Sequence, residues 1–224
     1  MELKNYYMLD EEQKELLPYT IANQILLKVF TGELKHGERV KESNVAMALG
    51  VSNIPVRESF YILENLGVLE RLPRKGVRVK EFTDKEFIAY TDALVELTWI
   101  ILTYAQQLWT TEQIENLKQL AVEAKSSLNE RNIVAYILDC DRILRLMTEV
   151  ADNLAFKKMY NDISCITLTY CRVYWTDFNR LEERYESLLQ TIEAIEKNDI
   201  EMAKEQVEIF IRKQEPSLYR YKKV

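Results

Sequence analysis

The pattern of apolar and polar positions divides the chain into two kinds of unit. Residues 18–34 and 42–49 each carry apolar side chains at helical spacing, and a third such stripe begins near Asn53. Gly50 lies between the second and third stripes, where a glycine can end a helix at positive φ. Two helices joined by a tight glycine turn are typical of the helix-turn-helix motif.

A short hairpin is predicted directly after the third helix. Gly67 ends that helix, residues 68–72 and 77–79 alternate as strands, and residues 73–76 form a turn that contains proline and glycine. A hairpin in this place is a wing, whose basic tip can reach phosphates or the neighbouring minor groove while a helix enters the major groove. The alternative is a solvated hairpin on an unrelated α+β domain.

The remaining sequence is predicted to be helical throughout. Neither proline nor glycine occurs from Thr83 to Phe210, and apolar positions recur with a period near 3.6. The predicted helices are 84–108, 111–128, 131–150, 153–175, 178–197 and 199–213. The expected fold is therefore mainly α: a winged helix-turn-helix with a small β wing over residues 1–80, followed by an all-α bundle of six or seven helices over residues 81–224.

The net charge is −6, but the charged residues are distributed unevenly along the chain. Residues 1–80 hold 12 Lys and Arg against 11 Asp and Glu, so the acidic excess lies in the second part. Residues 71–80 contain five basic side chains and no acidic one. Local charge decides which partner a surface attracts, so the first unit remains a candidate for binding nucleic acid.

Several other classes of protein are not expected. No apolar run approaches the ~18 residues that span a bilayer, and the N-terminus lacks the apolar core of a signal peptide, so we expect a cytoplasmic chain without a membrane partner. The three cysteines form no CxxC pair, which argues against a disulfide framework or a zinc knuckle. One histidine, and no nucleophile elbow, phosphate-cradling loop or paired carboxylates, predict no catalytic residues and no enzyme.

A specific resemblance covers the first unit. Leu49-Gly50-Val51-Ser52, then Pro55-Val56-Arg57-Glu58 and a glycine at position 76, resembles the winged-helix domain of GntR-family transcriptional regulators over roughly residues 18–80. The family pattern at the turn is GVSRTPVREAL, and this chain has asparagine and isoleucine at positions 53 and 54. The second helix starts E-R-E-L-A in the family, whereas serine replaces that arginine here.

The resemblance implies a set of DNA-contacting residues. These are Ser43, Asn44, Ser52, Asn53, Ile54, Arg57, Arg74, Lys75 and Gly76. The family uses an arginine at the position of Arg57 against the operator, and this arginine is retained. The arginines lost at Ser43 and Asn53 are bidentate readers of guanine, each worth ~1–3 kcal/mol of discrimination, while Asn53 could read adenine. We expect DNA binding with an unusual operator or with weaker affinity.

The second unit resembles the FCD domain of the FadR subfamily. Residues 139–144 followed by Asn153, and residues 192–199 followed by Ala203, carry this resemblance. It implies a small-molecule effector in the bundle core and, in many members, a metal held by one aspartate and three histidines. Those positions fall on Cys140, Leu144, Leu188 and Phe210, which do not form a site for a divalent ion. We therefore expect no metal cofactor.

Two interpretations of this core remain open. It either encloses a cavity for an apolar or acyl-type effector, or its side chains fill the former metal site and the domain serves as a dimer scaffold. The candidate effector-pocket residues are Glu96, Cys140, Asp141, Leu144, Arg145, Thr148, Leu188 and Phe210.

The leading functional hypothesis is a transcriptional repressor that binds a palindromic double-stranded operator as a homodimer and responds to a small-molecule effector. Effector binding would change the relative placement of the two winged helices, which requires different ligand affinities in the two arrangements. The alternative is an effector-independent winged-helix protein whose helical domain is a dimer or protein-interaction scaffold.

Overall fold

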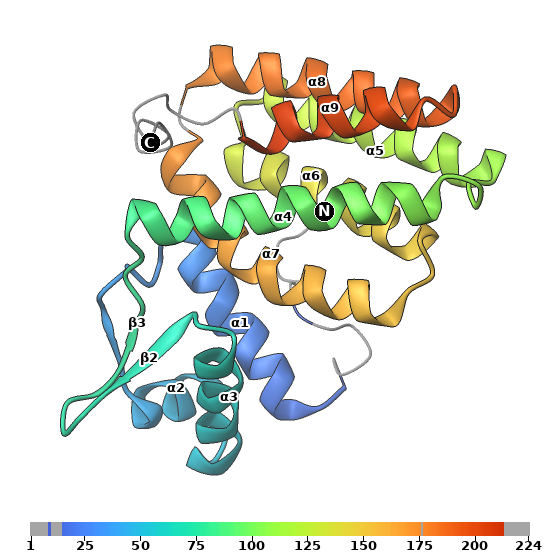
Figure 1. Cartoon of the computed structure of the whole chain (residues 1–224). Helices are drawn as coiled ribbons and strands as arrows, with labels where there is room; N and C mark the ends of the chain where they lie inside the picture. The colour runs from blue at the N-terminus through green and yellow to red at the C-terminus, as the bar shows by residue number, and fades with distance from the viewer. Residues whose placement is uncertain (1–8, 10–14, 176, 213–224) are drawn as a thin grey trace. The chain divides into compact units, whose positions relative to one another are not determined.

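The computed structural model describes residues 9, 15–175 and 177–212, and the chain divides into two compact units, Met1–Thr83 and Asp84–Val224 (Figure 1). The observed class is the one predicted, mainly helical with a winged helix-turn-helix first and an all-helical unit second.

The first unit contains three helices and a small antiparallel sheet. Its elements are α1 (Leu17–Thr31), β1 (Arg39–Val40), α2 (Glu42–Leu49), α3 (Asn53–Asn65), β2 (Leu69–Leu72) and β3 (Gly76–Val79). The strand order is β1-β3-β2, and the β2–β3 hairpin projects from the helices as the wing (Figure 1). Strand β1 was not predicted from the sequence.

Local chemistry explains the turn between α2 and α3. Gly50 has φ 67°, in the left-handed region that favours glycine, and its N–H donates to the Ala46 carbonyl to close α2. Ser52 occupies the N-cap position of α3, and its side chain makes no capping hydrogen bond. Pro55 lies in the first turn of α3, where its missing N–H leaves no helix bond unmade.

The core of the first unit lies between α1, α3 and the sheet. Val56, Phe60 and Leu63 of α3 are fully buried, and α1 packs against them. Val77 and Val79 of β3 are buried as well, because alternate residues of the strand face the core. Each such side chain contributes about 1.5–3 kcal/mol of apolar transfer free energy, which holds α3 and the wing in fixed positions.

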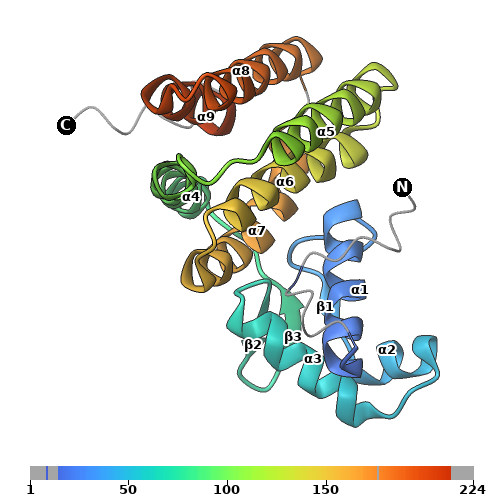
Figure 2. The same cartoon turned by 90° about the vertical axis from the view of Figure 1, so that its right-hand side faces the viewer.

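The second unit is a bundle of six helices within the described residues. They are α4 (Asp84–Ala105), α5 (Thr111–Asn129), α6 (Ile133–Val150), α7 (Leu154–Tyr174), α8 (Phe178–Glu196) and α9 (Ile200–Arg212). Helices α8 and α9 lie side by side, as do α5 and α6, and α4 packs against α6, α7 and α9 (Figures 1 and 2).

Side-chain caps separate these helices in the absence of glycine and proline. Thr110 and Gln113 form a reciprocal capping box at the start of α5. Asn132, Asn153 and Asp177 accept backbone N–H groups at the starts of α6, α7 and α8. The breaks are therefore defined by polar residues that satisfy the free N–H groups of each helix.

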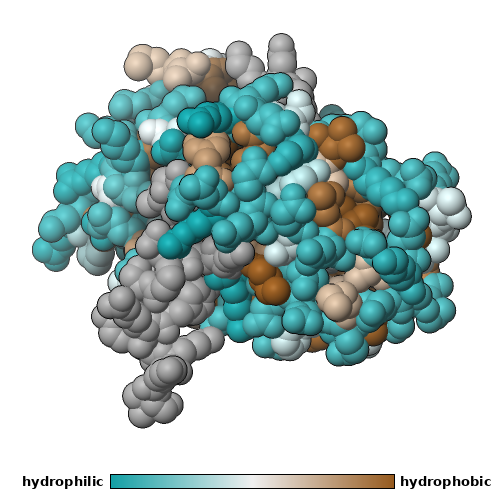
Figure 3. All heavy atoms as spheres, turned by 90° about the horizontal axis from the view of Figure 1, so that it is seen from above, coloured by the Kyte–Doolittle hydropathy of each residue, from teal (hydrophilic) through white to brown (hydrophobic). Residues whose placement is uncertain are grey.

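Helix α4 is unusually apolar for its length. Its most apolar 18-residue stretch has a mean hydropathy of 1.3, and it is the one helix of the described chain that is long and apolar enough to cross a membrane. It packs against three other helices of the bundle, and core helices of water-soluble proteins share these properties. Figure 3 shows the protein from above the view of Figure 1. The surface on this side is largely hydrophilic, and polar residues separate its apolar areas.

A fully buried arginine ties the last helix to the bundle. Arg184 of α8 is 1% exposed, and its guanidinium donates to the backbone carbonyls of Phe210 and Ile211 at the end of α9. The same guanidinium lies 4.5 Å from the centre of the Trp175 ring. Carbonyls that have no partner within α9 thus receive donors from α8.

Candidate nucleic-acid interface and helical-core cavity

All the residues predicted to contact DNA are exposed. Ser43 and Asn44 lie on the first turn of α2, Asn53 and Ile54 begin α3, and Arg57 follows one turn later. Ser52 precedes α3 in the turn, while Arg74, Lys75 and Gly76 form the tip of the wing. The start of α3 and the wing tip are thus both open to a ligand, as groove reading by a winged helix requires.

Arg57 does not lie free on the surface of α3. Its Nε and one terminal nitrogen donate to Glu42 Oε2 at 3.1 and 3.0 Å, which joins α3 to the start of α2. The hydrogen bond that Arg57 donates to Glu42 raises the pKa of Arg57 above its usual value, and the charge of Glu42 acts in the same direction. The Arg57 side chain is 55% exposed, so this pair is readily exchanged for a nucleic-acid contact.

Two arginines of the basic 71–80 segment are also paired. Arg71 donates to both Glu64 oxygens, with the shorter distance 2.7 Å, and its guanidinium lies 5.3 Å from the centre of the Tyr61 ring. Arg78 donates to Glu70 across the hairpin at 2.7 Å. The segment therefore carries less unneutralised charge than its sequence suggests, because the fold brings glutamates from α3 and β2 to it.

A small cavity lies among the described residues of the helical unit. Its volume is about 40 Å³. Predicted pocket residues that line it are Cys140, Asp141, Leu144 and Phe210. The other lining residues are Thr91, Leu94, Ile137, Tyr160, Ser164, Thr167, Leu168, Cys171, Trp175 and Ile211. Pockets for drug-sized ligands measure about 300–1,000 Å³, so this space holds little more than a water molecule or two.

Four predicted pocket residues lie outside the cavity lining. Glu96 is exposed on α4, and its carboxylate lies 3.8 Å from the guanidinium of Arg212 at the end of α9. Thr148 is buried and donates to the Leu144 carbonyl within its own helix at 2.9 Å. Leu188 is fully buried in α8 packing, and Arg145 is engaged in a polar network beside the cavity.

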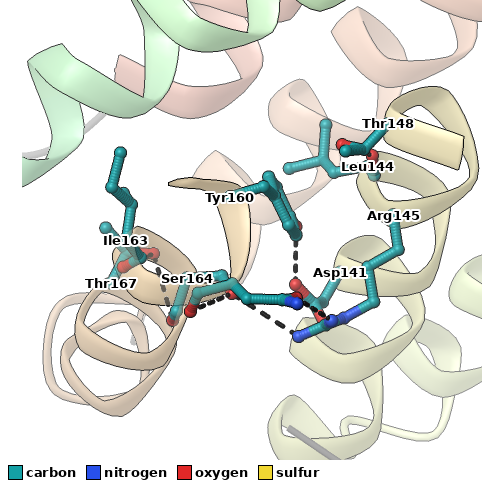
Figure 4. Close-up of polar contacts among 9 residues, drawn as sticks. Asp141, Leu144, Arg145, Thr148, Tyr160, Ile163, Ser164 and Thr167 are labelled. Atoms are coloured by element: carbon teal, nitrogen blue, oxygen red, sulfur yellow. Dashed lines mark hydrogen bonds and ion pairs between the residues drawn. The ribbon is translucent and has the colours of Figure 1, made fainter. Parts of the chain in front are cut away.

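That network links α6 to α7 (Figure 4). The Asp141 side chain is completely buried and accepts from Arg145 Nε and from the Tyr160 hydroxyl, both at 2.6 Å. Arg145 also donates to the Asn161 side-chain oxygen at 2.6 Å. A buried carboxylate is stable when it has such partners, and this one is satisfied from two helices.

The residues at the positions where the FCD resemblance implies metal ligands do not fit a divalent cation. Leu144, Leu188 and Phe210 offer no donor atom, and burial raises the pKa of the Cys140 thiol well above its usual value. Among the residues that the structure describes, no group of three or more His, Cys, Asp or Glu side chains is arranged to hold a metal ion. The helix pair α6–α7 is instead joined by hydrogen bonds from the Tyr160 hydroxyl to Asp141 and from Arg145 to Asn161.

Comparison with known proteins agrees with the architecture. Residues 19–79 match the family of bacterial regulatory proteins, gntR family. The chain is 25% identical over 194 residues to an uncharacterised helix-turn-helix transcriptional regulator, YdhC of Bacillus subtilis, with 85% of this chain and 86% of that protein covered. It is 26% identical over 206 residues to a probable D-xylose utilization operon transcriptional repressor of Paenarthrobacter nicotinovorans, with 87% of each covered.

Among solved structures, E. coli McbR/YncC shares the fold with a TM-score of 0.77 at 19% identity, over 88% of this chain and 94% of that one. The family is one of DNA-binding regulators and not of enzymes. The match over residues 19–79 covers both the helix-turn-helix and the wing, so the first unit is similar to the DNA-binding part of gntR-family regulators.

Proposed function

We propose that this chain is a cytoplasmic transcriptional repressor that binds a palindromic operator as a homodimer. The observation that carries the proposal is the joint exposure of the α3 start and the wing tip, with Asn53, Arg57, Arg74 and Lys75 all open to solvent. A helix in the major groove and a wing tip at the neighbouring minor groove give one half-site per chain. The repressor named in Paenarthrobacter nicotinovorans, similar over 87% of this chain, supports the direction of regulation.

The proposed dimer is inferred from the winged helix, the part of each chain that would read DNA. One chain carries one winged helix within its described residues, so a two-fold operator requires two copies. We assign the helical unit to the FCD type of the FadR subfamily and give it the role of holding the two copies together. In our proposal it does so without a metal, since three of the four family ligand positions are apolar.

An effector-responsive function requires the core to open. The cavity of about 40 Å³ would have to enlarge to several hundred Å³ before an apolar or acyl-type ligand could enter between α4, α6, α7 and α9. Only a ligand that prefers the opened arrangement would shift the protein to it and move the winged helices. Such a ligand would contact Cys140, Leu144 and Phe210 first, since these residues line the present cavity.

The small cavity favours a second candidate function for this unit. If the side chains have filled the former metal site, the helical unit is a dimer scaffold and the regulator works without an effector. Native mass spectrometry of the purified protein separates the two functions: a bound small molecule supports the effector, and a clean dimer mass supports the scaffold.

The experiment that tests the main proposal is selection of bound sequences from a random DNA pool with the purified chain. We expect a two-fold symmetric site that differs from the family operator at the bases read by Ser43 and Asn53. About 6–8 phosphate contacts per dimer predict that the logarithm of the binding constant falls with log salt with a slope of about −5 to −7. An asymmetric site refutes the dimer model, and failure to enrich any sequence refutes specific binding.

A further inference from the structure

A groove separates the two parts of the first unit that are predicted to contact DNA. Its volume is about 430 Å³, and it lies between the β1–α2 segment and the wing. The residues that line it are Arg39, Val40, Lys41, Glu42, Ser43, Asn53, Phe60, Arg71, Lys75, Gly76 and Val77. Val40, Phe60 and Val77 are buried, so the groove has an apolar base and polar, exposed walls.

The charged groups of this groove fall into two classes. Glu42 is held by Arg57, and Arg71 is held by Glu64, so both are already neutralised by the protein. The other class is Arg39, Lys41 and Lys75, which are exposed and form no ion pair with any residue that the structure describes. Three cations thus face one concave surface, and a concave surface focuses their field on an anion.

The position of the groove indicates which anion it meets. On one side lie Ser43 and Asn53 of the helix-turn-helix, and on the other lie Lys75 and Gly76 of the wing. The helix reads the major groove of DNA and the wing tip reaches the adjacent minor groove. The sugar-phosphate backbone of one strand separates these two grooves, so it has to pass between the two protein elements.

We propose that this groove holds a backbone phosphate of bound DNA and that Arg39, Lys41 and Lys75 bind it. The inference rests on the proposed DNA-binding function and adds to it a site on β1 and on the residue before α2. Lysine binds phosphate as a point charge and arginine as a planar fork, and neither contact reads a base. These residues therefore determine how strongly the chain binds DNA and leave its sequence preference to α3.

The test measures the salt dependence of binding to a fluorescein-labelled duplex of random sequence by fluorescence anisotropy, with the full chain. Each of Arg39→Gln and Lys41→Gln is expected to reduce the steepness of the log–log slope by about 1 per bound chain and to weaken binding to all sequences alike. Arg39→Lys keeps the charge and is expected to restore the slope. Lys28→Gln is the matched control, because Lys28 is an exposed lysine of α1 outside the groove, and it is expected to leave the slope unchanged.

Three results would overturn the proposal. The first is a slope unaltered by both glutamine variants, with circular dichroism showing that they are folded. The second is an equal reduction by Lys28→Gln, which would mean that only the total charge matters. The third is a changed base preference when the selection is repeated with Lys41→Gln, because Lys41 would then read a base and not a phosphate. If the unaltered chain binds no duplex even in dilute buffer, the DNA-binding function itself fails together with the groove.

Discussion

Replacing Tyr160 with phenylalanine removes a single hydroxyl from the buried network of the helical unit. That hydroxyl donates to the Asp141 carboxylate at 2.6 Å, and the carboxylate has no exposed surface through which water could replace it. A hydrogen bond to a charged group contributes about 1.5–3 kcal/mol, and the ring of phenylalanine fills the same space without a cavity. We therefore expect Tyr160→Phe to lower the free energy of unfolding by about 1.5–3 kcal/mol.

Urea unfolding followed by tryptophan fluorescence measures this change. The three tryptophans, Trp99, Trp109 and Trp175, all belong to the second unit, so the signal reports on the helical bundle alone. The urea midpoint should fall without a change in the slope m, because the surface exposed on unfolding is unaltered.

Tyr104→Phe is the matched control, since Tyr104 is 57% exposed and the same hydroxyl is removed there. We expect this variant to lie within about 0.5 kcal/mol of the unaltered chain. In the double variant Tyr160→Phe with Asp141→Asn, the loss of unfolding free energy should differ from the sum of the two single losses by about 0.5–3 kcal/mol, because the two groups interact directly. If Tyr160→Phe lowers the free energy of unfolding as little as Tyr104→Phe does, the assignment of the Tyr160 hydroxyl as a structural donor is refuted.

Further predictions concern the DNA interface, the thiols and the turn. Glu42→Gln removes the charge that holds Arg57, so binding to random duplex DNA should strengthen and its salt dependence steepen, measured by anisotropy; weaker binding would mean that the pair positions Arg57 productively. Burial raises the pKa of Cys165 and of Cys171 to about 12, so neither thiol should react with Ellman's reagent at pH 8 until the chain is unfolded, and rapid labelling of native protein would indicate an open core. Since unfolded thiols ionise near pH 8.5, this burial also predicts that stability falls as pH rises from about 8.5 toward 12. Gly50→Ala should destabilise the first unit by about 1–2 kcal/mol because its φ is 67°, and an unchanged melting curve by circular dichroism would show that the turn relaxes.

The sequence predicted the elements of this fold well where periodicity or glycine marked them. Helix α2 begins and ends at the predicted residues, and the helices of the second unit differ from their predicted bounds only near the ends. Strand β1 escaped prediction because two residues cannot show alternation, and its partner β3 comes much later in the chain. Pairing of that kind depends on tertiary structure and not on local preference.

The sites were harder to predict than the fold. The spacing of Asp141 and Arg145 is the i,i+4 spacing of an ion pair on a helix, and this signal could have revealed the network in advance. Their partner Tyr160 lies on another helix, and nothing local marks it. Glu96 was predicted as a pocket residue because a polar side chain could orient a ligand, whereas it lies near Arg212 at the end of the last described helix.

The hydrogen bonds donated by Arg184 affect how the helical bundle opens locally. Helix ends ordinarily fray, and their amide hydrogens exchange with solvent far faster than those in the middle of a helix. Here the closing carbonyls of α9 are bound from a neighbouring helix in a place that water does not reach. The final turn of α9 should therefore retain its deuterium label about as long as the centre of the helix does, and opening there should require the bundle to come apart rather than one end to unwind.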